Sequence, residues 1–132
     1  MKKLIIPLIL LLLSSCDETS LDQINQFSGR WIIAFKNNSG NILREGTVTL
    51  QDNGTICDKI RISASGDSVY FMANVGSDGI ITGNFADSCN VGATGSVSGA
   101  LSEILGIVTG TGNWNDTTRS PDASGTWEAR RY

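Results

Sequence analysis

From Gly29 onward, turn signals at close spacing divide the sequence into short strand-like runs. In residues 47–51 and 69–75, apolar and polar side chains alternate, which is the period of a β-strand with one buried face. Asn53-Gly54 is a pair that tight hairpin turns prefer, because both positions tolerate positive φ. Helical periodicity is nearly absent. The chain is therefore expected to form an all-β fold of consecutive antiparallel strands.

We expect about eight strands, over residues 31–35, 47–51, 56–62, 69–75, 80–85, 91–98, 106–114 and 125–132. Asp58 interrupts an apolar face and predicts a bulge or strand end, while residues 101–105 are expected to form one helical turn or a bulged connection. Such a meander closes into a barrel or packs as a sandwich. Glycines at alternate positions along the strands favour the barrel, because strands of small barrels coil sharply and glycine relieves crowding at the bends. We predict a single closed eight-stranded antiparallel β-barrel over residues 28–132.

Two tryptophan motifs bracket this domain: residues 28–31 read Ser-Gly-Arg-Trp, and residues 124–127 read Ser-Gly-Thr-Trp. A Gly-x-Trp that opens the first strand resembles lipocalins and avidins, which are small eight-stranded barrels that bind apolar or compact ligands. The lipocalin resemblance implies that the first tryptophan closes one barrel end beneath a basic residue of the last strand, as a cation–π pair. The alternative is plain core packing of both tryptophans. The residues expected at this barrel end are Trp31, Trp127, Arg130 and Arg131.

The N-terminal segment has the order of parts of a bacterial export signal. Two lysines precede an apolar run over residues 4–13, whose helical length of roughly 15 Å is about half of a bilayer core. A signal-peptide core has this length. Residues 13–16 then read Leu-Ser-Ser-Cys, which resembles the lipobox of bacterial lipoproteins and implies cleavage after residue 15 and lipid on Cys16. An ordinary secretory signal with a chance cysteine is the alternative.

We therefore expect a lipoprotein signal peptide over residues 1–15, a lipidated polar tether over residues 16–27 and the barrel beyond it. Several acyl chains on one residue give stable anchoring, which predicts attachment to a membrane of the bacterial cell envelope, on its periplasmic face or at the cell surface. Asp17 resembles the inner-membrane retention signal of enterobacteria, but other bacterial groups follow different rules, so either membrane fits.

Once lipid occupies Cys16, Cys57 and Cys89 are left as an even pair. Outside the cytoplasm such a pair usually forms a disulfide. Two buried free thiols are the alternative. A redox-active pair is disfavoured, because no Cys-x-x-Cys spacing is present.

The chain contains no histidine, which removes the commonest general base and metal ligand. Neither a Ser-His-Asp or Cys-His site nor a zinc site of cysteine and histidine can be built from it. The carboxylates that remain on paper show no spacing that selects a catalytic pair: Asp58, Asp87, Glu103 and Glu128. Without Lys2 and Lys3 the domain carries eight basic and thirteen acidic residues, a net charge of −5, which disfavours nucleic acid. We expect no enzyme activity, cofactor or metal.

Two functional hypotheses follow. The first is a membrane-anchored, non-catalytic binding module that holds a small apolar ligand inside its barrel. The second is an interaction protein, structural factor or hydrolase inhibitor that acts through its outer surface. Residues 28–31 also resemble the start of bacterial inhibitors of secreted metalloproteases, which are small disulfide-bonded barrels. Tyr70 and Met72 are the candidate ligand contacts: a position in a cavity favours the first hypothesis, and an outer apolar patch favours the second.

Overall fold

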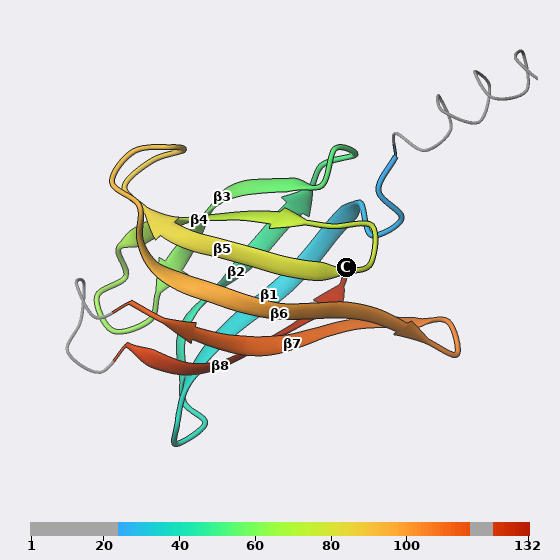
Figure 1. The fold of residues 1–132 in the computed structure, drawn as a ribbon. Helices are drawn as coiled ribbons and strands as arrows, with labels where there is room; N and C mark the ends of the chain where they lie inside the picture. Colours follow the sequence, from blue (N-terminus) through green and yellow to red (C-terminus); the bar gives the residue numbers. More distant parts are fainter. Residues whose placement is uncertain (1–23, 117–122) are drawn as a thin grey trace, which may run out of the picture.

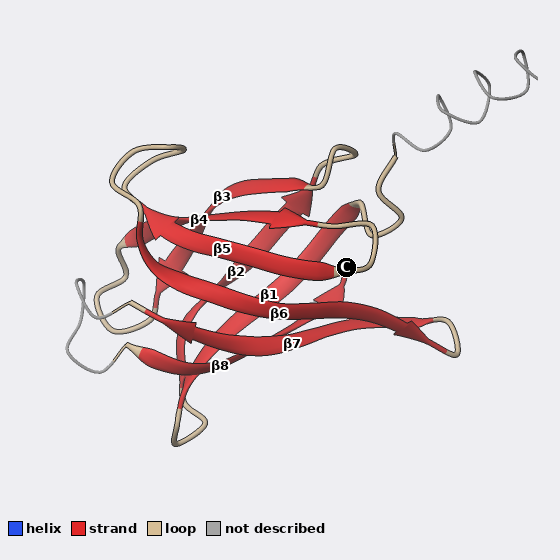
Figure 2. Cartoon of the chain, viewed as in Figure 1, coloured by secondary structure: helices blue, strands red, loops and turns tan. Residues whose placement is uncertain are grey.

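Eight antiparallel strands close into one barrel (Figure 1), as the sequence predicts. The computed structural model describes residues 24–116 and 123–132, and that part of the chain contains strands, turns and loops but no helix (Figure 2). The expected signal peptide and Cys16 lie outside the described residues. The strands are β1 (Gly29–Asn37), β2 (Ile42–Leu50), β3 (Thr55–Ile62), β4 (Ser68–Val75), β5 (Ile80–Ala86), β6 (Thr94–Ile104), β7 (Ile107–Asn115) and β8 (Ser124–Arg131).

The barrel is an up-and-down meander in which each strand pairs with its neighbours in sequence. It closes because β8 returns beside β1, from the pair Trp31↔Arg131 to the pair Asn37↔Gly125. We call the end at which β1 begins and β8 ends the proximal end, and the opposite end the distal end. The turns β2–β3, β4–β5 and β6–β7 therefore lie at the proximal end.

Residues 101–105 form neither a helical turn nor a bulged connection, so that prediction is wrong. Strand β6 continues through Leu101, whose side chain is buried, to the pair Ile104↔Ile107. The turn is made by Leu105 and Gly106, both with positive φ. The inward side chain of Leu101 and the unbroken register with β7 keep this segment extended.

Asp58 does not end its strand, since β3 runs through it from Thr55 to Ile62. Its carboxylate instead accepts the backbone N–H of Thr49 on β2 at 2.6 Å. The two strands pair directly only at Arg44↔Ile62 and Glu45↔Arg61. The Asp58 side chain, which lies on the apolar face of β3, therefore provides a hydrogen bond between β2 and β3 beyond the residues that pair directly.

The interior of the barrel is filled by the protein's own side chains. Phe35 is fully buried and packs edge-on against Phe71, Phe85 and Trp114, with ring centroids 5.1–5.6 Å apart. Edge-to-face packing at this separation is favourable, because the positive ring edge meets the negative face. Aliphatic side chains from β1 to β6 and Ala129 of β8 complete this core, and the partly buried Val108 of β7 packs against it.

A buried ion pair lies within this apolar interior. The Arg44 guanidinium donates to the Asp116 carboxylate at 2.9 Å, and the two side chains are only 3% and 0% exposed. The same guanidinium stacks over Phe85 and Trp114, 4.3 and 5.1 Å from the ring centroids. A charge removed from water is tolerated when it is paired and hydrogen-bonded in this way.

Glycines on β6 and β7 make room for the Trp127 indole. The indole N–H donates to the Ser98 carbonyl at 2.9 Å. A Cβ added to Gly112 would come closer than 3.0 Å both to this carbonyl oxygen and to the indole nitrogen. Glycine is therefore required at position 112 by the close approach of backbone and indole.

Gly112→Ala is expected to lower the free energy of unfolding by about 1–3 kcal/mol, as overpacking of a closed core does. Urea denaturation followed by tryptophan fluorescence measures the change. Thr111→Ala is the matched control, because this neighbour faces outward and should shift stability by less than about 0.5 kcal/mol. Equal stability of the two variants would contradict the packing argument.

Candidate functional site

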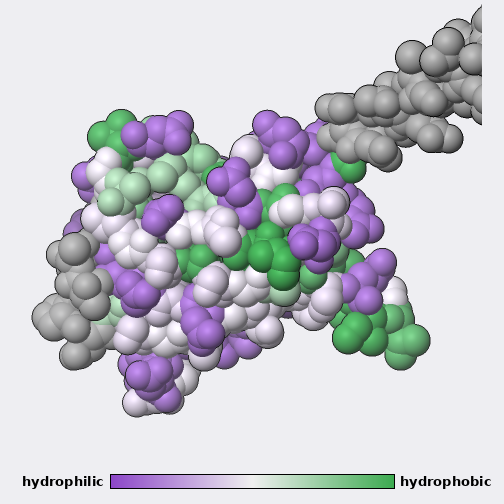
Figure 3. Space-filling model, in the orientation of Figure 1, coloured by the Kyte–Doolittle hydropathy of each residue, from purple (hydrophilic) through white to green (hydrophobic). Residues whose placement is uncertain are grey.

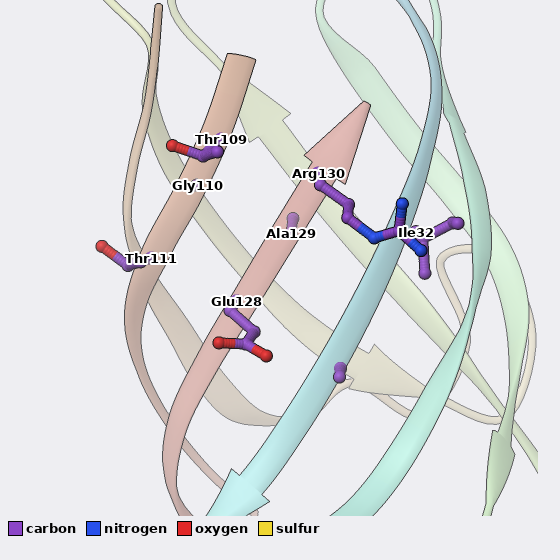
Figure 4. Close-up of a pocket in the computed structure, with 8 residues that line it drawn as sticks. Ile32, Thr109, Gly110, Thr111, Glu128, Ala129 and Arg130 are labelled. Carbon is purple, nitrogen blue, oxygen red and sulfur yellow. The ribbon is translucent and has the colours of Figure 1, made fainter. Parts of the chain in front are cut away.

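A shallow groove crosses the outer face of β1, β7 and β8, where two rungs of side chains run across the three strands. One rung is Ile32↔Arg130↔Thr109 and the next is Ala34↔Glu128↔Thr111. The open groove has a volume of about 460 Å³ (Figure 4). We call it the lateral groove. It exists because small residues on the outer face, Ala34 above all, leave space between longer neighbours.

The floor of the lateral groove is apolar and its flanks are charged. Ile32 and Ala34 are half-buried outward residues of β1. Arg130 extends from β8 beside Ile32 in Figure 4, one rung away from Glu128. The Glu128 carboxylate lies 2.8 Å from the Lys36 ammonium group. An apolar floor with a few oriented polar groups suits one or two apolar side chains of a partner.

A second groove, of about 660 Å³, lies on the outer face of β3 to β6. We call it the polar groove, because hydroxyl and amide side chains supply most of its lining. Outward-facing members are Thr55, Met72, Asn74, Thr82, Asn84, Ser96 and Ser98. Several of these polar groups already bond within the protein; for example, the Asn84 amide donates to the Gly95 carbonyl at 2.8 Å.

Tyr70 and Met72 point away from the barrel interior. Both are half-buried on the outer face of β4, opposite the inward Phe71. Met72 lines the polar groove, and its sulfur accepts the Asn90 N–H at 2.9 Å. The Tyr70 ring lies 5.8 Å from the Lys59 ammonium group. The two residues therefore occupy neither an internal cavity nor the lateral groove.

The Cys57–Cys89 disulfide is present, which confirms its prediction. It joins β3 to the connection between β5 and β6, across a sequence separation of 32 residues. Cys57 also lines the polar groove. The bond therefore fastens a long distal connection to the wall of the barrel.

The four residues expected at one barrel end lie in three different settings. The Arg131 guanidinium sits 5.4 Å from the centroid of the buried Trp31 ring at the proximal end. The Trp31 indole also donates to the Phe27 carbonyl at 2.9 Å. Trp127 pairs with Phe35, four residues further along β1, and so lies deeper in the barrel. Arg130 faces the lateral groove.

Sequence reasoning missed the lateral groove and the buried ion pair. Period-two alternation does place Arg44 on the face of Val48 and Leu50, and it places Asp116 in step with Trp114. Two opposite charges on faces that are expected to be buried could have indicated a buried ion pair. The groove has no comparable signal, because it depends on the register in which β8 pairs with β1 and β7.

Within the described residues, the carboxylates weighed as catalytic candidates lie on β3, β6, β8 and the β5–β6 connection. In the same part of the chain, no three histidine, cysteine, aspartate or glutamate side chains gather as a metal site. No segment of residues 24–116 and 123–132 forms a helix that could span a membrane.

No family model matches the chain, and neither the curated proteins nor the solved structures provide a match.

Proposed function

We propose that this chain is a lipid-anchored, non-catalytic binding protein of the bacterial cell envelope that engages a partner protein through the lateral groove. Support for the anchor comes from the lipobox-like residues 13–16. Support for a non-catalytic role comes from the absence of histidine in the sequence. The observation that carries the choice of the outer surface is the filled interior, in which Phe35 is fully buried and packs against three aromatic rings.

A small apolar ligand inside the barrel is the alternative hypothesis. It requires the aromatic cluster around Phe35 to move aside, which close packing opposes. Native mass spectrometry of protein purified from its own host decides between the two. A bare mass supports recognition on the outer surface, whereas a reproducible extra mass that is lost on denaturation supports the internal ligand.

Site-specific photocrosslinking tests the lateral groove. A photoreactive phenylalanine analogue at Thr111 is expected to form a defined protein adduct in living cells, because this side chain borders the groove. The same analogue at Thr82, an outward position of β5 in the polar groove, is the control. An adduct formed at position 82 and not at 111 would move the binding site to the polar groove and contradict this proposal.

Ala34→Arg is expected to reduce the adduct at position 111 by about tenfold or more, because a filled anchor pocket removes a binding hot spot. The new side chain points outward between Glu45 and Glu128, the cross-strand neighbours of Ala34, so the fold should be retained. Adduct yield on immunoblots and thermal unfolding of the purified variant measure the two effects. An unchanged yield in a folded variant would rule out the groove as the contact.

A further inference from the structure

Exposed apolar side chains gather at the proximal end of the barrel. Six of the eight large apolar residues that are exposed in the described part of the chain lie there: Ile24, Ile80, Ile104, Leu105, Ile107 and Tyr132. The remaining two, Ile42 and Val91, lie at the distal end. Single exposed apolar residues are normal, but a gathered set marks a contact surface.

The β6–β7 hairpin carries the largest share of this apolar surface. The β5–β6 ladder ends at Ile80↔Ala100 and the β7–β8 ladder ends at Thr109↔Arg130, so the hairpin continues beyond both neighbours as a two-stranded ribbon. Ile104 lies three positions beyond Leu101 along the strand, an extension of about 10 Å. Figure 3 shows the end of this ribbon as a hydrophobic projection.

The residue at the tip is unusual for its position. Leu105 is 98% exposed and has φ of +54°, followed by Gly106 at +80°. Positive φ at both central residues favours asparagine and glycine, and leucine rarely adopts it. Leucine at this position is therefore unfavourable both for the backbone conformation and for exposure to water. We attribute the presence of leucine to a function of its apolar side chain.

The position of the N-terminal segment indicates what covers this surface. Ile24 and Asn25 lie at the proximal end, where the Asn25 N–H donates to the Asp52 carbonyl in the β2–β3 turn. Cys16 precedes Ile24 by eight residues, which span at most about 28 Å when extended. Lipid on Cys16 would therefore hold this end of the barrel at the membrane. The apolar ribbon then faces the bilayer.

We propose that the proximal end is a membrane-docking face, in which Ile104, Leu105 and Ile107 enter the interfacial region of the bilayer. This inference rests on the proposed lipid anchor. Tyr132 fits the same surface, because its exposed ring lies beside the Arg30 guanidinium at 4.7 Å. An aromatic ring next to a cation suits the headgroup level of a membrane. Docking would fix the orientation of the barrel and direct its distal end away from the membrane.

Fluorophore labelling in the lipidated protein tests this orientation. Leu105→Cys and Ser39→Cys each add a single free thiol, because the Cys57–Cys89 disulfide is closed. Residue 39 lies in the distal β1–β2 turn and is the matched control. In vesicles of phosphatidylethanolamine and phosphatidylglycerol, brominated acyl chains should quench a label at 105 about fivefold more than a label at 39. Equal quenching would overturn the inference.

The mass of the purified protein separates failure of the anchor from failure of the docking face. A lipidated mass with a label at 105 that stays in water leaves the anchor intact and overturns the docking face. A label that is shielded but not quenched by brominated lipid indicates a protein neighbour or a second copy, and overturns it too. A mass without lipid refutes the anchor, and vesicle binding of the unlipidated protein then tests the docking face by itself.

Vesicle sedimentation of the chain with Cys16→Ser provides that second measurement. In this background Leu105→Asn should weaken binding by about tenfold, through loss of one inserted apolar side chain. Asparagine tolerates the positive φ, so the variant should fold at least as well as the parent. Val91→Asn, which changes an exposed apolar residue at the distal end, should leave binding unchanged. Equal binding of the two variants would overturn the inference.

Discussion

Asp116→Ala is expected to lower the free energy of unfolding by about 3–5 kcal/mol, because it removes the carboxylate that pairs with the Arg44 guanidinium inside the barrel. The effect is large because both side chains are almost completely buried, so water cannot solvate the Arg44 guanidinium. The total free energy of unfolding of most domains is only about 5–15 kcal/mol, so the variant should be partly unfolded near body temperature. Urea denaturation monitored by circular dichroism measures the change.

The surface pair Lys36–Glu128 provides a control at nearly the same distance, 2.8 Å instead of 2.9 Å. Because the Glu128 side chain is 60% exposed, Glu128→Ala should change stability by no more than about 1 kcal/mol. The double variant Arg44→Met with Asp116→Ala should recover much of the loss, since it removes both charges of the buried pair. A double variant as unstable as Asp116→Ala alone would show that the loss comes from packing and not from charge.

Replacing both Cys57 and Cys89 by serine is expected to lower the free energy of unfolding by roughly 3–4 kcal/mol. The disulfide closes a loop across 32 residues, and opening it restores conformational freedom to the unfolded chain. Urea denaturation with and without dithiothreitol measures the effect. The parent should lose stability on reduction, whereas the serine variant should not respond to the reductant.

Hydrogen exchange locates the structural consequence of this loss. Amides in the β5–β6 connection and in the neighbouring part of β3 should exchange faster in the serine variant, while those of β1 and β8 should keep their relative protection. Equal stability of oxidised and reduced parent protein would contradict the prediction.

Much of the fold is predictable because each strand carries its own alternation and each turn its own signal. Residues 69–75 show this best, since Val69, Phe71 and Val75 face the core as their spacing predicts. The first half of β2 is missed, because Arg44 and Gly46 stand at inward positions where apolar residues are expected. The end of β6 is missed for a different reason: an exposed Leu105 does not resemble a turn residue.

The candidate site is less predictable than the fold, because it forms across strands that are distant in sequence. Ile32 and Thr109 share a rung of the lateral groove only because β8 inserts between β1 and β7. The alternation indicates that both residues face outward, but not that they are neighbours. Closure brings β1, β8 and β7 side by side, but the register between them decides which outward residues meet, and the alternation within each strand does not specify that register.

Closure also has a consequence for engineering. Since β8 pairs with β1, the first and last strands have no open edge where they meet, so main-chain pairing with a foreign strand has little to build on in this part of the wall. Recognition on the wall must then come from outward side chains, such as Thr109 and Thr111, that the core does not need. Libraries randomised at the outward positions of β1, β7 and β8 should therefore yield new binding specificities on an unchanged backbone.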